Sequence, residues 1–348
     1  MADVTDAAFR RLLAKYSAHT RKDGTVGGPD VMWTEFVSAD GLLLATPEGK
    51  EKLQADLIYS EAERPIVAQL FTANPEHMEQ VAALCRELGF DGVDINMGCP
   101  DRSIEKQGCG AAMIKTPEVA VEVIRAAKRG ARHGEKDGIP VSVKTRLGYK
   151  EDQVEEWIVT LLKEEPAALT VHLRTRKDLS QVPARWERLT RVVELRDELS
   201  LETLVLGNGD VLSLADAEEK VAASGADGAM IGRALFGDPW FFHPTKQLPI
   251  HLTALPTHGV DRETIIKAAT EEEGVEYITL AERLRVLVEH TKLFAELLPH
   301  KHFAIMKKHY KAYANGFPYA KELRIALMET SSPAEVEAVV KDFLIKQH

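Results

Sequence analysis

Cysteine is scarce in this sequence, with only three residues among 348. An odd and sparse set of thiols does not form a disulfide framework, and it is typical of a reducing compartment. Apolar runs that approach the ~20 residues of a membrane helix are missing. The cationic and then apolar N-terminal pattern of a secretory signal is missing as well. We therefore predict a cytoplasmic protein that makes no membrane association.

An excess of positive charge is also absent, because the formal net charge is −10. This balance argues against a general electrostatic attraction to nucleic acid. The charge is uneven, however: residues 301–324 carry six Lys and Arg against one acidic residue, which gives a local balance of +5. This stretch is either a solvated basic helix face or a local phosphate-binding patch.

Short β-branched runs alternate with helical segments up to about residue 242. Regular alternation of strand and helix indicates a parallel sheet. Asn74-Pro75 and Thr116-Pro117 are typical helix starts, with proline in the first helical position. The seven predicted strands are Val31–Phe36, Pro65–Phe71, Gly92–Met97, Pro140–Arg146, Leu169–Arg174, Thr203–Gly207 and Gly228–Gly232.

The Gly-x-Gly-x-x-Gly turn of a doubly wound dinucleotide fold does not follow the first of these strands. Polar residues and glycine instead end several strands, as in a barrel whose site is assembled from strand ends. We therefore predict an α/β fold, a (β/α)8 TIM-type barrel. With seven strands found, the barrel lacks its first strand, which we expect to precede Met1, since two parallel edges would otherwise be unpaired.

The chain is predicted to have three parts. Residues 1–243 form the barrel, and residues 244–275, which contain several prolines, form a linker or irregular insertion. Residues 276–348 form a small all-α domain with helices at about 277–297, 300–315, 319–328 and 333–346.

Cys99 is the candidate reactive residue. Cys85 lies on the apolar stripe of its predicted helix and belongs to the core, and Cys109 lies in a flexible loop where it could be incidental. Cys99 follows a strand end in Asn96-Met97-Gly98-Cys99-Pro100, a turn that would hold the thiol in the barrel mouth. It is either a small residue filling a tight turn or a nucleophile or general acid.

Other strand ends indicate what works beside this thiol. Gly207-Asn208-Gly209-Asp210 and Gly232-Arg233 end consecutive strands, the usual phosphate site of a barrel. Lys144 in a buried strand is costly unless it has a use, such as balancing the charge of a reduced flavin. His172 is either a satisfied core histidine or a ring contact, and the Gln69 amide could bind a ring edge.

Together these runs resemble the tRNA-dihydrouridine synthase family. The likeness spans nearly the whole barrel and continues in the helical domain at Met306-Lys307-Lys308-His309 and Gly316-Phe317-Pro318. The matching barrel stretches are Met1-Ala2-Asp3-Val4-Thr5-Asp6, Ile66-Val67-Ala68-Gln69-Leu70, Asp94-Ile95-Asn96-Met97-Gly98-Cys99-Pro100, Val143-Lys144-Thr145-Arg146-Leu147-Gly148, His172-Leu173-Arg174-Thr175-Arg176, Gly207-Asn208-Gly209-Asp210 and Met230-Ile231-Gly232-Arg233.

The resemblance implies a barrel that binds FMN and a helical domain that binds tRNA. No obligatory protein partner is evident from the sequence. NADPH would reduce FMN, the flavin would give hydride to uridine C6, and Cys99 would protonate C5. The residues expected at FMN are Met1, Gln69, Lys144, His172, Asn208, Gly209, Asp210, Gly232 and Arg233. Those expected at the substrate are Asn96, Arg174, Arg176, Lys301, Lys307, Lys308 and Lys311.

The sequence departs from the family in its missing first strand, in residues 175–183, which are not glycine-rich, and in residues 245–273, which look inserted. Two other functions are compatible with parts of the sequence. One is a barrel reductase of free pyrimidines, such as a dihydroorotate dehydrogenase relative, although a free base needs no basic helical domain. The other is a non-catalytic RNA-binding protein.

Overall fold

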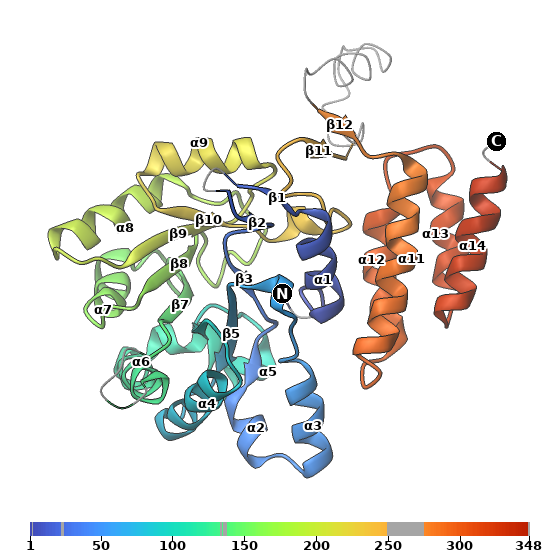
Figure 1. Cartoon of the computed structure of the whole chain (residues 1–348). Helices are drawn as coiled ribbons and strands as arrows, with labels where there is room; N and C mark the ends of the chain where they lie inside the picture. Colours follow the sequence, from blue (N-terminus) through green and yellow to red (C-terminus); the bar gives the residue numbers. More distant parts are fainter. Residues whose placement is uncertain (2, 22–23, 133, 135–137, 249–274, 347–348) are drawn as a thin grey trace. The chain divides into compact units, whose positions relative to one another are not determined.

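The structure is a computed structural model that describes residues 1, 3–21, 24–132, 134, 138–248 and 275–346. It divides into two compact units (Figure 1). The first unit comprises Met1–Ala2 and Val31–Ala234, and the second comprises Asp3–Asp30 and Leu235–His348. Across the described ranges, no helix combines the length and the apolar character that a membrane span requires.

The first unit is built on a curled parallel sheet, and the predicted TIM-like α/β fold is confirmed. The strand order is β10-β9-β8-β7-β6-β5-β3, and β4 also pairs with β5. In the part of the chain that the structure describes, β10 and β3 do not pair with each other, so the sheet is open there. The strands are β3 (Met32–Trp33), β4 (Val37–Ser38), β5 (Ile66–Phe71), β6 (Gly92–Asn96), β7 (Val141–Arg146), β8 (Ala168–His172), β9 (Leu204–Asn208) and β10 (Gly228–Met230).

The prediction of one continuous strand over residues 31–36 is wrong. The structure has two short strands, β3 and β4, that both pair with β5. Between them, the Thr34 hydroxyl accepts a hydrogen bond from the Gln69 backbone N–H at 3.0 Å and donates to the Glu35 carbonyl at 2.8 Å. A side-chain oxygen thus takes the place of a backbone carbonyl in the ladder, and the strand is interrupted.

Helices of the first unit cover the outside of this sheet (Figure 1). Asn74 caps α4 as predicted, because its side chain accepts from the backbone N–H groups of Glu76 and His77, whereas Thr116 makes no side-chain cap. Gly130 lets α6 approach α4 closely, since a Cβ there would lie 2.0 Å from the Glu79 carbonyl oxygen. The helices are α2 (Ala39–Leu44), α3 (Pro47–Ala55), α4 (Pro75–Glu87), α5 (Arg102–Glu105), α6 (Pro117–Ala131), α7 (Val159–Leu162), α8 (Glu187–Glu198) and α9 (Leu214–Ser224).

The second unit is mainly helical. A short antiparallel pair joins β1 (His19–Thr20) to β2 (Val26–Gly27), and a parallel pair joins β11 (Lys246–Gln247) to β12 (Glu276–Tyr277). The helices are α1 (Ala7–Tyr16), α11 (Leu280–Leu297), α12 (Met306–Tyr313), α13 (Ala320–Met328) and α14 (Pro333–Lys346).

This division differs from the predicted domain limits of 243 and 276. Residues 3–30 and 235–248 group with the helical part rather than with the barrel. The reason is the apolar face of α1, whose Ala8 and Leu12 share one buried cluster with Trp240, Leu284 and Met306. Most of the predicted linker, residues 249–274, lies outside the described residues.

Candidate active site

The C-terminal halves of five neighbouring strands place polar side chains side by side on one face of the sheet. In the strand register, Gln69 lies beside Asp94, and Asn96 lies beside Lys144. His172 lies between Arg146 and Asn208 in the same way. Register neighbours in a parallel sheet point to the same face. The structure therefore brings together strand-end residues that are distant in sequence.

The turn that carries Cys99 is held from two sides. The Asn96 side-chain oxygen accepts from the backbone N–H groups of Gly98 at 3.1 Å and Cys99 at 2.9 Å. On the other side, the Ala111 N–H donates to the Cys99 carbonyl at 2.9 Å. Gly110 has φ +61°, and a Cβ there would lie 2.6 Å from the same carbonyl oxygen. Glycine is therefore required at 110 for this turn to form.

The Cys99 side chain is only partly buried. Burial raises the pKa of the thiol above its ordinary value, while the charges of Arg146 and Lys144 act in the opposite direction. A thiol with a raised pKa stays protonated at neutral pH. It is therefore suited to giving a proton rather than to attacking as a thiolate.

Arg146 is a site residue that sequence reasoning missed. It is 6% exposed, and its Nε donates to the Gly98 carbonyl at 2.7 Å. Its Nη1 donates to the carbonyls of Thr175 and Leu179, both at 3.2 Å. Arg146 thereby joins the Cys99 turn to the loop after β8. The sequence signal that could have identified Arg146 is its position two residues after Lys144, which places both side chains on the same face of β7.

Lys144 lies at the centre of this face. Its Nζ donates to the Asn208 side-chain oxygen at 3.2 Å, and the Asn208 Nδ2 donates to the Met230 carbonyl at 2.8 Å. Burial and, to a lesser extent, the charge of Arg146 lower the pKa of Lys144 to about 8, while Asp94 opposes the change. A bound anion would favour the charged ammonium here.

His172 is held as a neutral imidazole. Burial lowers its pKa far below the ordinary value, and neighbouring cations including Lys144 and Arg146 add to the effect. Its Nε2 lies 3.2 Å from Nη1 of Arg174, which can only donate. The Nε2 atom is therefore the acceptor, and Nδ1 carries the proton.

The turn after β9 has the open backbone of an anion site. Gly209 has φ +123° and Asp210 has φ +50°. Asp210 pairs with Arg233 at 2.8 Å. At Gly232, the nearest atoms to an added Cβ are Met1 Sδ at 3.8 Å and Asn208 Nδ2 at 4.0 Å. This turn therefore combines open space, a guanidinium and a glycine backbone, which are features of phosphate-binding sites.

Two predicted RNA contacts have other partners. Arg174 is 2% exposed, and its guanidinium donates to Asp210 and to the Val182 carbonyl. Arg176 pairs with Glu105, with Nε and Oε1 2.8 Å apart. Both arginines therefore have carboxylate partners within the first unit, and their contact with RNA phosphates stays a prediction.

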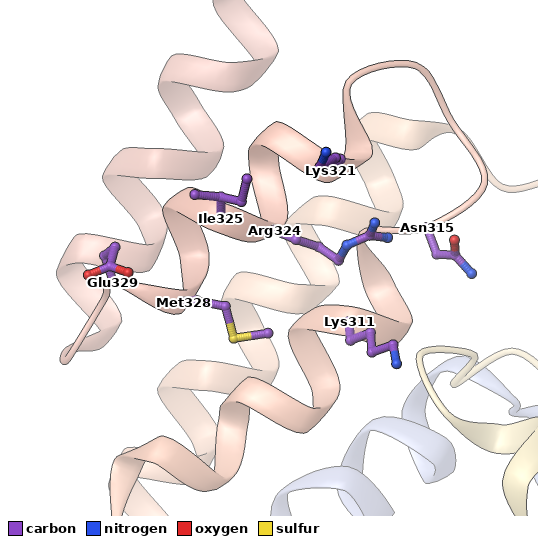
Figure 2. Close-up of a pocket in the computed structure, with 7 residues that line it drawn as sticks. All are labelled: Lys311, Asn315, Lys321, Arg324, Ile325, Met328 and Glu329. Atoms are coloured by element: carbon purple, nitrogen blue, oxygen red, sulfur yellow. The ribbon is translucent and has the colours of Figure 1, made fainter.

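The predicted lysine contacts of the second unit have different surroundings. Lys308 pairs with Asp3 at 2.7 Å. Lys311 instead lines a groove of about 610 Å³ together with Lys321 and Arg324. Figure 2 shows Lys311 on α12 and the other two on α13, with the Arg324 guanidinium extending toward Asn315. Lys321 and Arg324 contributed to the predicted basic stretch but were not singled out as contacts. Lys301 and Lys307 remain predicted contacts.

Known proteins identify the family. The family model described as dihydrouridine synthase (Dus) matches residues 1–347. A probable tRNA-dihydrouridine synthase 2 from Bacillus subtilis is 36% identical over 344 residues, which cover 99% of this chain and 92% of that protein. A probable tRNA-dihydrouridine synthase from Staphylococcus aureus is 34% identical over 346 residues, with 99% and 91% covered. The chain belongs to the dihydrouridine synthase family.

Proposed function

We propose that the chain reduces uridines in tRNA to 5,6-dihydrouridine, with FMN as its cofactor and NADPH as the reductant. The observation that carries this proposal is the Cys99 thiol. It is protonated, held by its backbone on both sides, and set beside a polar sheet face that contains Lys144. A reductase of the uracil 5,6 double bond needs an acid at that position, and the family membership names the product.

The residues of the first unit fit FMN. Gly209, Gly232 and Arg233 would hold its phosphate, in the space beside Met1 and Asn208. Gln69, Lys144 and the Nδ1–H of His172 would bind the ring system, and the Lys144 ammonium would offset the negative charge of the reduced ring. Asp210 would act through Arg233, which it positions. When bound and reduced, FMN supplies a hydride to C6 of the uracil.

Cys99 completes the reaction as the acid. Hydride addition at C6 places negative charge on C5 and O4 of the ring. The Cys99 S–H bond breaks, its proton goes to C5, and the sulfur keeps the electron pair as a thiolate. Arg146 and Lys144 stabilise that thiolate electrostatically, and a proton from solvent restores the thiol before the next turnover. Asn96 would place the uracil.

The groove lined by Lys311, Lys321 and Arg324 would bind the RNA backbone. Three cations on two adjacent helices offer charge to phosphates without reading a sequence. The target uridine must leave its stack to reach a flavin, and backbone binding supplies the free energy for that step. This function agrees with the predicted cytoplasmic setting.

The experiment is an assay of the flavin-loaded protein with NADPH and a tRNA transcript that contains no dihydrouridine. Dihydrouridine formation at defined positions is the expected result, with no reduction of free uracil. Reduction of free uracil alone would identify a pyrimidine reductase. A colourless protein that binds tRNA without reducing it would identify a non-catalytic RNA-binding protein. Either outcome overturns the proposal.

A further inference from the structure

The chemistry above leaves one buried carboxylate unused. Asp94 on β6 is fully buried. Its Oδ1 accepts from the Ser142 hydroxyl at 2.6 Å, and its Oδ2 accepts from Gln69 Nε2 at 2.7 Å. Lys144, on the neighbouring β7, is the charged side chain whose field acts on it. Burying a carboxylate costs free energy, which indicates a role for Asp94, and its hydrogen bonds connect it to the Cys99 turn.

The hydrogen bonds continue from Asp94 to the Cys99 turn in one line. Gln69 donates to Asp94, Asn96 Nδ2 donates to Gln69 Oε1 at 3.0 Å, and Asn96 Oδ1 accepts from the N–H groups of Gly98 and Cys99. We call Asp94, Gln69 and Asn96 the amide chain. It runs across β5 and β6, where the register sets Gln69 beside Asp94.

The two ends of the amide chain impose the same direction. Backbone N–H groups can only donate, so the Asn96 oxygen must face the turn and its nitrogen must face Gln69. The Gln69 oxygen then faces Asn96, and its nitrogen faces Asp94. An ionised carboxylate can only accept, so Asp94 requires the same orientation of Gln69. Neither amide can flip without placing two donors or two acceptors against each other.

This direction decides what the two amides offer a ligand. Each amide nitrogen carries two N–H groups, and each uses one of them within the amide chain. One N–H therefore remains on Gln69 and one on Asn96, while both amide oxygens face protein donors. The pair presents donors, which match the carbonyl oxygens and unprotonated ring nitrogens of a flavin or a uracil.

We propose that Asp94 is a positioning residue that fixes the direction of the amide chain, so that Gln69 and Asn96 each keep one N–H donor for the bound ring and the Cys99 turn is held for proton transfer. This inference rests on the proposed function for the identity of the ring. The direction of the amide chain itself is a property of the protein.

Three variants test the direction. In Asn96→Asp, the new carboxylate still accepts from the turn but cannot donate to Gln69, so Gln69 must flip and turn its oxygen toward Asp94. In Asp94→Asn, the new amide can accept from Gln69 and donate to Ser142, so the original direction survives. In the double variant every hydrogen bond is restored, with the amide chain reversed.

The first readout is the melting midpoint at pH 8, well above the pKa of about 6 to which burial raises Asp94. We expect Asn96→Asp to lower it by roughly 3 °C or more, because a buried acceptor loses its partner. Asp94→Asn alone should not lower it, and adding Asp94→Asn to Asn96→Asp should restore it. A merely structural role of residue 96 would leave the double variant as unstable as Asn96→Asp, and that result overturns the proposal.

The second readout is dihydrouridine formation at saturating tRNA. Asp94→Asn should retain turnover within roughly threefold, since the donors stay in place. The double variant should remain about 100-fold slow despite its restored stability, because residue 96 now presents an acceptor. Full turnover in the double variant would refute the donor pattern. If the unmodified protein forms no dihydrouridine, the proposed function fails, while the melting experiment still decides the direction of the amide chain.

Discussion

Buried ionisable side chains are held in opposite ways in two clusters, one in each unit of the molecule. In the first unit, Asp94, Lys144 and Arg146 all make hydrogen bonds within a continuous polar face. In the second unit, His290 and His309 are fully buried with ring centroids 4.4 Å apart, and His290 Nε2 has no hydrogen-bond partner. The first arrangement holds charged groups where the proposed flavin and uracil would bind. The second uses histidine as a neutral aromatic ring that fills a core.

The largest effect should come from Cys99, the proposed acid of the first unit. Cys99→Ala should slow single-turnover reduction by about 100- to 10,000-fold, the range for loss of a general acid, while the flavin absorption of the purified protein is unchanged. Cys109→Ala is the matched control, because Cys109 is a buried thiol beside the same turn, and it should keep most of its activity. Equal losses in both variants would mean that packing, and not proton donation, is what Cys99 contributes.

The second unit should affect binding rather than chemistry. Lys311→Ala combined with Lys321→Ala should raise the KM for tRNA by about tenfold and reduce the salt dependence of binding by about two phosphate contacts, with kcat preserved. Lys308→Ala is the control, since Lys308 already pairs with Asp3. A loss of kcat in the groove variant, with KM unchanged, would contradict this division of labour.

Acid should destabilise the second unit through its histidine pair. Burial lowers the pKa of His309 to about 4 and that of His290 well below its ordinary value of 6.5. The stabilisation from keeping these rings neutral is present above pH 6.5 and is lost as pH falls toward 4. Urea unfolding followed between pH 7 and 4.5 should show this loss, and His309→Phe should reduce its slope. An unchanged slope would mean that other groups control the acid response.

The smallest effect should appear in the pH dependence of the first unit. Burial raises the pKa of Asp94 to about 6 from an ordinary 3.8. Its contribution to stability is therefore fully present below pH 3.8 and is lost as pH rises through 6. Asp94→Asn should remove a decline on the order of 2 kcal/mol between these limits. Identical curves for the two proteins would show that folding does not raise the pKa of Asp94, and would contradict this prediction.

Much of the first unit was predictable, because buried parallel strands are continuous apolar runs whose ends are marked by polar residues. Gln69, Lys144, His172 and Asn208 were recognised in this way, and the register brings them together. The interruption at Thr34 was not predictable, because it depends on a hydroxyl accepting from a strand 35 residues away.

The roles of the charged residues were harder to predict, because partners distant in sequence decide them. Arg174 and Arg176 were predicted as rim cations, and the sequence could not show their carboxylate partners, Asp210 and Glu105, which lie 36 and 71 residues away. Asp94 was overlooked because a single carboxylate within a buried strand gives no periodic signal. Residues 3–30 were placed with the barrel because sequence order cannot show that α1 packs with α11 and α12.

The turn at Cys99 also has a consequence for mutational tolerance. Gly110 contributes no side-chain atom to the reaction, yet any β-carbon at that position would collide with the Cys99 carbonyl. In a saturation screen for tRNA modification, position 110 should therefore reject substitutions as strictly as position 99. A residue eleven places along the chain would then look catalytic in such a screen, solely because of the space that it leaves empty.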